Sequence, residues 1–277
     1  MKIGVSGQSL GQISSLEETL DFLHELGVSY LEVWPCNIPS FSGENHNDTY
    51  ANRDVAAAAA MFAKKGIGVS AVSFSGAFAK WLADDEQFYQ AELLRAVEVA
   101  HELGAKIVNH YCFYLSLHEL DVDRLKRVMT PALERAKEYG IVMALENEAH
   151  DMTKTPVEMR TLLEAVNHPN LQTNYDAVNY YHAEEEGFPY AYEILKDRIA
   201  YVHIKNGCRA PEKGRFSIRY TSIEDGAVNI AALLSRLHKD GYEGYCVIEP
   251  HCPPVEVKEY LIQDINWLKK HNEGGIL

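Results

Sequence analysis

The sequence predicts an α/β fold, a single (β/α)8 TIM barrel, from three observations. Short runs rich in β-branched residues alternate with amphipathic helical stretches, and eight such runs occur along the chain. Because consecutive parallel strands need a crossover, this alternation indicates a parallel sheet covered by helices. The 277 residues, 47% of them hydrophobic, suit one barrel of eight strand–helix units. No linker or low-complexity tract divides residues 1–277, so we expect one domain.

The strands follow from this pattern in chain order. They are predicted over residues 2–7, 30–35, 68–74, 106–111, 141–147, 171–176, 199–206 and 244–250. A doubly wound open sheet is the structural alternative. The first turn reads GVSGQSLG, however, and lacks the GxGxxG pattern of the dinucleotide-binding form of that fold. We therefore expect a closed barrel.

The helices between these strands have recognisable starts and stops. Ser15 with Glu18 three residues later forms a capping-box pattern before a helix over 16–26, which Gly27 ends. Pro156 stands in the first turn of a helix over 155–166, where its missing N–H costs little. The other helices are predicted over residues 54–65, 85–103, 121–139, 190–197, 228–239 and 255–270.

Two loops are longer than their connections require. One covers residues 36–52 after the second predicted strand, and the other covers residues 207–226 after the seventh. Because both follow the C-terminal ends of strands, we expect them over the face where barrel enzymes place their active sites. A lid or a contact between subunits is the predicted role.

Composition and charge argue against several kinds of partner. Twenty-six basic residues against 40 acidic ones give a net charge of −14, which disfavours binding to nucleic acid and to anionic membranes. The N-terminus lacks the apolar stretch of a signal peptide, and no run reaches the roughly 18 apolar residues of a membrane span. The five cysteines are scattered, without a CxxC pair, which indicates free thiols in a reducing compartment. We expect a cytoplasmic protein.

Four successive strands end in residues that bind metals: Glu146, Asp176, His203 and Glu249. In a barrel the C-terminal ends of the strands meet at one mouth, so these side chains can converge on one ion. Because side chains alternate along a strand, further residues of the same strands are expected to point inward with them, namely Val142, Ala144, Tyr201, Lys205, Tyr245 and Val247. Three carboxylates and one imidazole suit Mn²⁺, Mg²⁺ or Co²⁺, and Zn²⁺ is also compatible. We predict one divalent metal ion, with Mn²⁺ favoured.

The motifs around these residues resemble the xylose isomerase-like superfamily of sugar isomerases and epimerases. They are GVSYLEVW in the second strand, LEN in the fifth, YDAVN at the sixth, VHIKN at the seventh and GYEGYCVIEP leading into the eighth. The similarity extends over essentially the whole chain. It implies a TIM barrel that binds a metal through the same four residues.

The ketose 3-epimerase branch is similar enough to compare by position. This resemblance implies that Glu146 and Glu249 are both metal ligands and catalytic acid–base groups. It also implies that Arg209, six residues after the ligand histidine, binds substrate. The sequence departs from the branch at two positions. Asn179 stands where the branch has a histidine, and Met152 stands where it has a substrate-binding glutamate.

These residues predict proton transfer beside a carbonyl group. A metal that chelates a carbonyl oxygen and the neighbouring hydroxyl acidifies the carbon-bound proton and stabilises an enediolate. Return of the proton to the opposite face gives an epimer, and its return to the adjacent carbon gives an isomer. Lys205 and Arg209 are expected to bind substrate oxygens. Further candidates for the pocket wall are His110, His150 and Trp34.

The sequence leaves the position of two acidic residues open. Glu148 shares the direction of Glu146, and lies either in the mouth of the barrel or in a solvated loop. Glu32, in the second strand, is either buried in the barrel or faces the mouth.

Three other functions compete with a sugar isomerase or epimerase. A 3-keto-glycoside lyase or C-glycoside deglycosidase shares the metal and the proton abstraction but expels an aglycone. An endonuclease IV-like hydrolase needs further histidines for its zinc cluster, and this chain has Asn179 at one such position. A non-catalytic sugar-binding barrel has little need of four ligands. The expected partner is a small sugar or keto-sugar, and the resemblance implies a dimer or tetramer.

Overall fold

The structure, a computed structural model, describes residues 1–42, 49–74, 85–112, 120–214 and 217–272. Each strand of its barrel falls in a segment that the sequence predicts. These strands are β1 (Lys2–Ser6), β2 (Tyr30–Val33), β3 (Gly68–Ser73), β4 (Ile107–His110), β5 (Val142–Glu146), β6 (Leu171–Asp176), β7 (Ile199–Ile204) and β10 (Tyr245–Ile248).

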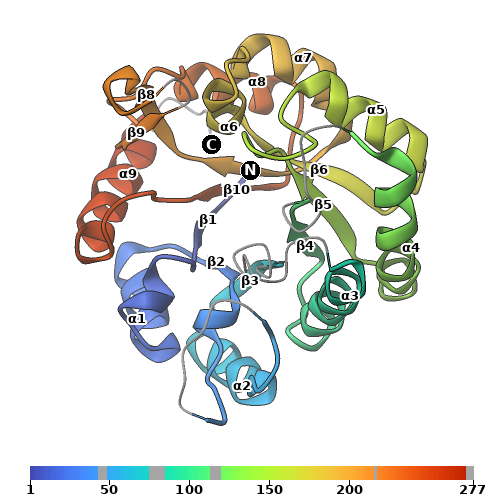
Figure 1. The fold of residues 1–277 in the computed structure, drawn as a ribbon. Helices are drawn as coiled ribbons and strands as arrows, with labels where there is room; N and C mark the ends of the chain where they lie inside the picture. The colour runs from blue at the N-terminus through green and yellow to red at the C-terminus, as the bar shows by residue number, and fades with distance from the viewer. Residues whose placement is uncertain (43–48, 75–84, 113–119, 215–216, 273–277) are drawn as a thin grey trace.

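The strands form a closed parallel sheet, which confirms the predicted (β/α)8 TIM barrel. Across the described residues their order is β1-β10-β7-β6-β5-β4-β3-β2, and β1 pairs with both β10 and β2. Val5 of β1 lies opposite Ile248 on one side and Leu31 on the other. Figure 1 shows the helices as a ring around these strands. The closed sheet excludes the doubly wound alternative.

The predicted helices are present with small shifts at their ends. They are α1 (Leu16–Leu26), α2 (Val55–Lys65), α3 (Glu86–Glu102), α4 (Val122–Tyr139), α5 (Pro156–Val166), α8 (Ile230–Lys239) and α9 (Val257–Asn272). The capping box of α1 is confirmed, because Ser15 Oγ accepts from the Glu18 amide and the Glu18 carboxylate accepts from the Ser15 amide. None of the described helices is both long and apolar enough to cross a membrane.

Three elements differ from the sequence prediction. The helix expected over 190–197 is shorter, with α7 (Tyr192–Leu195) followed by a 3₁₀ turn over Lys196–Arg198. A short helix, α6 (Ala177–His182), starts directly at the end of β6 and was not predicted. The loop over 207–226 contains an antiparallel hairpin of β8 (Asn206–Arg209) and β9 (Ile218–Thr221).

The limits of the domain, 1–277, and the covering of the C-terminal face by the loops 36–52 and 207–226 stay predictions. The barrel strands extend from Lys2 to Ile248, and both loops follow strands, β2 and β7. Residues 43–48 and 215–216 of these loops lie outside the described residues.

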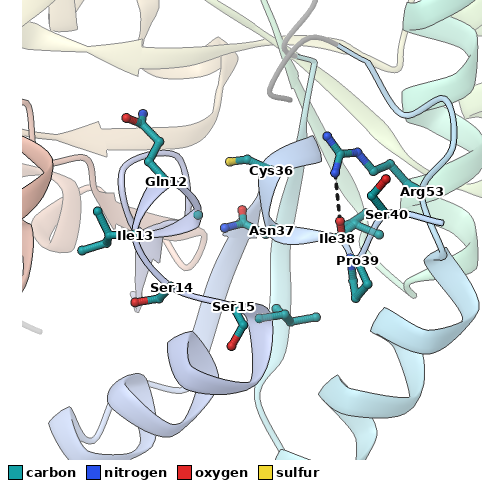
Figure 2. Close-up of a pocket in the computed structure, with 12 residues that line it drawn as sticks. Gln12, Ile13, Ser14, Ser15, Cys36, Asn37, Ile38, Pro39, Ser40 and Arg53 are labelled. Atoms are coloured by element: carbon teal, nitrogen blue, oxygen red, sulfur yellow. Dashed lines mark hydrogen bonds between the residues drawn. The ribbon is translucent and has the colours of Figure 1, made fainter. Parts of the chain in front are cut away.

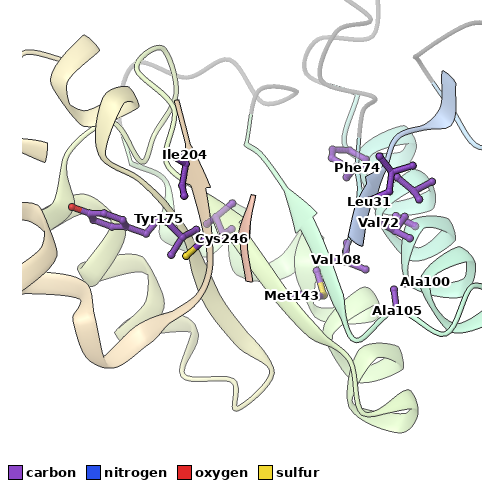
Figure 3. Close-up of a cluster of buried hydrophobic side chains, with 14 of the residues drawn as sticks. Leu31, Val72, Phe74, Ala100, Ala105, Val108, Met143, Tyr175, Ile204 and Cys246 are labelled. Atoms are coloured by element: carbon purple, nitrogen blue, oxygen red, sulfur yellow. The ribbon is translucent and has the colours of Figure 1, made fainter. Parts of the chain in front are cut away.

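Two apolar layers support the barrel. In the outer layer, Val72 of β3 and Val108 of β4 pack with Ala100 of α3, as Figure 3 shows. The inner layer contains Ala71, Ile107, Ala144, Tyr201 and Val247. The alternation of side chains predicted the last three of these inward positions. Tyr201 Oη lies 2.8 Å from Ser70 Oγ of β3, which ties β7 to a strand that is not its neighbour in the sheet.

Candidate metal centre

The four predicted ligands come together at the mouth of the barrel. Glu146 ends β5, Asp176 ends β6, His203 lies in β7 and Glu249 follows β10. Within the described residues, each offers one ligand atom, and these atoms all lie within 4.8 Å of one another. All four residues are buried. The shared edge of parallel strands therefore gathers groups that are about a hundred residues apart in sequence.

The imidazole of His203 has carboxylates next to both of its ring nitrogens. Its Nδ1 lies 3.0 Å from Glu146 Oε1, and 3.5 Å from Glu249 Oε2. Its Nε2 lies 3.1 Å from Glu32 Oε2 on the opposite side of the ring. Glu32 is fully buried inside the barrel, which answers the question that the sequence left open. Nδ1 is therefore the nitrogen that faces the ligand cluster.

Side-chain amides fix the carboxylate of Glu146. Asn109 Nδ2 and Asn174 Nδ2 donate to its Oε2 at 3.0 and 2.9 Å. Asn179 Nδ2 donates to its Oε1 at 3.2 Å. All three asparagines are buried. Donors on both oxygens leave this carboxylate little freedom to rotate.

Lys205 lies between two of the predicted ligands. Its Nζ is 2.9 Å from Asp176 Oδ2 and 2.8 Å from Glu249 Oε2. His251 Nε2 also approaches Glu249 Oε2, at 3.1 Å. Burial alone would lower the pKa of Lys205, but Asp176 and Glu249 raise it well above its ordinary value. The lysine therefore stays charged.

The electrostatics of the cluster suit a divalent cation. Burial alone would lower the pKa of His203, but Glu146, Glu32 and Glu249 raise it well above its ordinary value. A site that draws positive charge onto an imidazole has an excess of buried negative charge. Three carboxylates and one imidazole, with ligand atoms within 4.8 Å of one another, also match the donor set of Mn²⁺, Mg²⁺, Co²⁺ or Zn²⁺. The residues present thus fit a metal ion.

The two glutamates of the cluster have pKa values shifted in opposite directions. Burial raises the pKa of Glu146, and Glu249 adds to this shift while His203 opposes it. Burial would also raise the pKa of Glu249, but Lys205, His203 and His251 lower it well below its ordinary value. Two carboxylates with different proton affinities therefore lie side by side.

A pocket of about 90 Å³ opens onto the cluster. The described residues that line it are Gln8, Tyr111, Glu146, Glu148, Asn179, Lys205, Glu249 and His251. The sequence prediction missed Gln8, Tyr111 and His251 as lining residues. Gln8 follows β1, Tyr111 follows β4 and His251 follows β10. Their positions after strand ends were the sequence signal that could have identified them. Glu148, left open by the sequence, lies in the mouth.

Two predicted substrate residues lie outside this lining. Arg209 Nη2 donates to the Tyr181 carbonyl at 2.7 Å, and its guanidinium lies over the Tyr181 ring. His150 is exposed, and its ring meets the edge of His182 with centroids 4.9 Å apart. Their roles in substrate binding stay predictions.

Trp34 and His110 are buried, and neither is among the described residues that line the pocket. Trp34 Nε1 donates to Ser6 Oγ at 2.9 Å, and its ring lies 6.2 Å from that of Tyr111, which does line the pocket. Both ring nitrogens of His110 are buried without a hydrogen-bond partner among the described residues. Burial lowers the pKa of His110 to about 3, so the ring is neutral. Successive side chains of β4 point to opposite faces of the sheet. Asn109 points to the cluster, so the adjacent His110 points away from it.

The two departures from the ketose 3-epimerase branch lie in different surroundings. Asn179 lines the pocket and contacts Glu146. Met152 is buried outside the lining, where its sulfur accepts from the Asp121 amide at 3.3 Å. The position of Met152 therefore contributes no polar group to the described pocket.

A larger hollow of about 380 Å³ lies between the segments that follow β1 and β2. Figure 2 shows Cys36 and Asn37 between the segment Gln12–Ser15 and Arg53. Cys36 Sγ donates to the Gln8 carbonyl at 3.6 Å, so this hollow and the metal-site pocket share a wall. Burial raises the pKa of Cys36 to about 12, and the thiol is therefore protonated and unreactive at neutral pH.

Comparison with known proteins identifies the family. The family described as xylose isomerase-like TIM barrel matches residues 20–271. The chain belongs to this family. A comparison with curated protein sequences finds no match.

Solved structures share the xylose isomerase-like fold at low sequence identity. A xylose isomerase domain protein from Planctomyces limnophilus is 20% identical with a TM-score of 0.74, and the match covers 98% of this chain and 96% of that one. An IolI protein with a bound zinc atom is 19% identical with a TM-score of 0.72, covering 100% and 98%. A D-tagatose 3-epimerase-like protein is 19% identical with a TM-score of 0.71, covering 98% and 99%. These likenesses establish the fold.

Proposed function

We propose that the protein is a divalent-metal-dependent sugar isomerase or epimerase. The observation that carries this proposal is the pair Glu146 and Glu249. Both belong to the cluster that suits a metal ion, and both line one pocket beside Lys205. Family membership and the zinc atom bound by the IolI protein support a bound metal in this chain.

The ligands in this proposal are Glu146, Asp176, His203 through Nδ1, and Glu249, with Mn²⁺ favoured over Mg²⁺, Co²⁺ and Zn²⁺. When bound, the ion polarises a substrate carbonyl and the neighbouring hydroxyl and makes the carbon-bound proton acidic. Glu249, kept ionised by Lys205, accepts that proton at a carboxylate oxygen. Glu146, whose pKa burial raises, is the group that delivers a proton to the substrate carbon. Delivery to the opposite face gives an epimer, and delivery to the adjacent carbon gives an isomer.

Proton exchange with solvent tests this scheme. The Mn²⁺-loaded protein is incubated in D2O with ketoses, keto-glycosides and sugar phosphates, and NMR identifies the carbon that gains deuterium. We expect exchange with epimer or isomer formation, which chelation by EDTA abolishes. Glu249→Gln should lower the exchange rate at least about a hundredfold.

The matched control is Glu138→Gln, because Glu138 is a largely exposed residue on α4 outside the pocket lining. It should exchange at the wild-type rate. Full activity of Glu249→Gln, or of the metal-free protein, contradicts the two-carboxylate scheme.

A 3-keto-glycoside lyase or C-glycoside deglycosidase is the second candidate. The hollow of about 380 Å³ behind Gln8 and Cys36 favours it, because this space suits an aglycone beside the sugar site. Release of an aglycone from a keto-glycoside in the same incubation, without accumulation of an epimer, supports the lyase.

We further propose a cytoplasmic dimer or tetramer that acts on a small sugar or keto-sugar. The five cysteines are all free thiols, which supports a reducing compartment such as the cytoplasm.

Exposed apolar side chains support the oligomer. Phe41 and Val255 are 73% and 86% exposed, which suits a contact between copies of the chain. Light scattering coupled to gel filtration measures the molar mass, and a mass of one chain contradicts the oligomer.

A further inference from the structure

The β8–β9 hairpin places the ring of Tyr220 against the wall of the metal-site pocket. Tyr220, in β9, stacks on the imidazole of His251, with ring centroids 4.4 Å apart and planes inclined by 24°. Lys205 Nζ lies 5.8 Å from the centroid of the same tyrosine ring. His251 and Lys205 line the pocket, whereas Tyr220 lines a separate groove between the hairpin and α9. The tyrosine therefore supports the wall from outside the pocket.

Two donors of this wall converge on one oxygen of Glu249. Lys205 Nζ lies 2.8 Å from Glu249 Oε2, and His251 Nε2 lies 3.1 Å from the same atom. Because Nε2 is farther from Lys205 Nζ, at 3.4 Å, its hydrogen belongs to the contact with Glu249. Two donors on one oxygen restrict the rotation of this carboxylate, to which the proposed function gives the proton abstraction.

Of these two donors, His251 is the one that depends on Tyr220. Lys205 is 5% exposed, and its ammonium is held by both Asp176 and Glu249. The side chain of His251 is 33% exposed, and among the described residues the carboxylate of Glu249 is the one that reaches it. Exposed side chains change rotamer within picoseconds to nanoseconds. The stacked ring of Tyr220 removes this freedom from the imidazole.

The backbone that carries Tyr220 is fixed close to this ring. Asn206 Nδ2, at the base of the hairpin, donates to the Ile223 and Val228 carbonyls at 2.8 and 2.9 Å. The Ile223 amide in turn donates to Asp264 Oδ1 at 2.9 Å. Ile223 lies only three residues after Tyr220 in the chain, so the hairpin is a rigid support for the aromatic ring.

We propose that Tyr220 is a positioning residue, which holds the imidazole of His251 against Glu249 and so keeps that carboxylate oriented for proton transfer. This inference rests on the proposed function and adds a residue to it. A lid or a contact between subunits is the role that the sequence predicts for the loop over 207–226, and support of His251 is a separate role for the same segment.

The first experiment observes His251 directly in the metal-free full chain. Proton–carbon NMR spectra of the imidazole CH groups are recorded for the wild type, Tyr220→Leu and Tyr220→Phe, and the His251 signals are assigned by their loss in His251→Gln. The ring current of a stacked aromatic ring shifts these signals. We expect the shift to persist in Tyr220→Phe and to disappear in Tyr220→Leu, together with faster carbon relaxation of the freed imidazole. Equal His251 signals in the wild type and Tyr220→Leu overturn the proposal.

A matched control comes from a second stacked pair outside the pocket. Tyr139 of α4 stacks on His101 of α3, with centroids 3.9 Å apart, and the guanidinium of Arg135 lies over the tyrosine ring at 5.6 Å. Tyr139→Leu therefore removes the same kinds of contact at a distant position. It should leave the His251 signals and kcat as in the wild type.

The second experiment measures turnover at saturating Mn²⁺, with the ketose that exchanges fastest in D2O. Tyr220→Leu should lower kcat about tenfold and change KM less than about twofold, because a misplaced carboxylate slows proton transfer. Tyr220→Phe keeps the ring and should retain most of the wild-type kcat. An unchanged kcat in Tyr220→Leu overturns the proposal, as does a Tyr220→Phe variant that is equally slow.

A double-mutant cycle tests whether Tyr220 acts through His251. His251→Gln should itself lower kcat. If the tyrosine acts through this imidazole, adding Tyr220→Leu to His251→Gln should lower kcat less than about twofold further. Independent, multiplying losses in the double variant overturn the proposal.

The two proposals fail in different ways. Loss of the His251 shift in Tyr220→Leu, in a protein that exchanges no proton on any ketose, contradicts the isomerase or epimerase but supports the positioning of His251. Proton exchange at the wild-type rate in Tyr220→Leu supports the isomerase or epimerase but contradicts the positioning role.

Discussion

At the scale of single residues, Glu32 holds the imidazole of His203, one of the four predicted metal ligands, from inside the barrel. Its carboxylate accepts from Ser73 Oγ at 2.9 Å and from Asn109 Nδ2 at 3.1 Å, and it lies 3.1 Å from His203 Nε2. A carboxylate beside one ring nitrogen holds the proton there and turns the other nitrogen toward the metal. Glu32 is therefore a positioning residue, since it is not among the described residues that line the pocket.

Loss of Glu32 should weaken metal binding. Glu32→Leu removes the acceptor for Nε2, and we expect its Mn²⁺ affinity to fall about 10- to 100-fold. Glu32→Gln retains an oxygen and should lose less. Electron paramagnetic resonance titration with Mn²⁺ measures the affinity directly, and circular dichroism checks the fold. An exposed carboxylate on α3 provides the control, Glu102→Gln, and unchanged affinity in Glu32→Leu contradicts the positioning role.

The sequence predicts residues at strand ends better than residues within strands. Glu146, Asp176, His203 and Glu249 were predictable as a cluster because each lies at or near the C-terminal end of its strand, where a barrel gathers side chains. Glu32 was not, because alternation gives the direction of a side chain but not its depth in the barrel. A different limit applies to His110, because the direction of its side chain depends on where the strand starts.

At the scale of elements, the missed structures are short. Asp176 ends β6 and at the same time accepts from the Val178 and Asn179 amides as the N-cap of α6, so no turn residue separates the two elements. The strands of the β8–β9 hairpin have four residues each, and eight residues separate them. Such elements have neither helical periodicity nor a two-residue turn signal.

The buried carboxylate of Asp264 joins α9 to the segment that follows β9. Asp264 is 3% exposed and accepts from the Ile223 amide at 2.9 Å. Burial raises its pKa from 3.8 to about 6, although the Ile223 amide opposes this shift. The folded protein therefore retains a proton that the unfolded chain has lost between these pH values. Its contribution to stability is complete below about pH 4 and is lost as the pH rises through 6.

Asp264→Asn should remove this pH dependence, because an amide accepts the same hydrogen bond without titrating. Relative to the variant, the free energy of unfolding of the wild type should fall by at most about 1.4 kcal/mol per pH unit between pH 4 and 6. Urea unfolding followed by circular dichroism across this range measures both proteins. Parallel curves contradict the assignment of the titration to Asp264.

At the scale of the whole molecule, the metal centre joins β5, β6, β7 and the end of β10. The four ligands come from consecutive neighbours in the sheet order, β10-β7-β6-β5, which form half of the barrel. An ion bound there links these strands only in the folded state. Its binding free energy therefore adds to the stability of the barrel.

Mn²⁺ should raise the melting temperature, by an amount that grows with the logarithm of its concentration relative to the Kd. At a Mn²⁺ concentration about 100 times the Kd, the stabilisation is about 2.7 kcal/mol. For a barrel of this size we expect a rise of roughly 5 °C or more, reversed by EDTA. Differential scanning calorimetry measures the shift. His203→Gln lacks the imidazole ligand and should shift much less, and an equal shift in that variant indicates binding elsewhere.

The pairing of β1 with β10 also has a consequence for how the chain is made. During synthesis β1 is made before the other barrel strands, and its second neighbour, β10, is complete only when residues 245–248 have left the ribosome. Until then the growing chain has two bare strand edges, one on β1 and one on β7, and such edges invite pairing with other chains. Closure of the sheet is thus a late event in biogenesis, because most of the polypeptide must be complete before the first strand is protected.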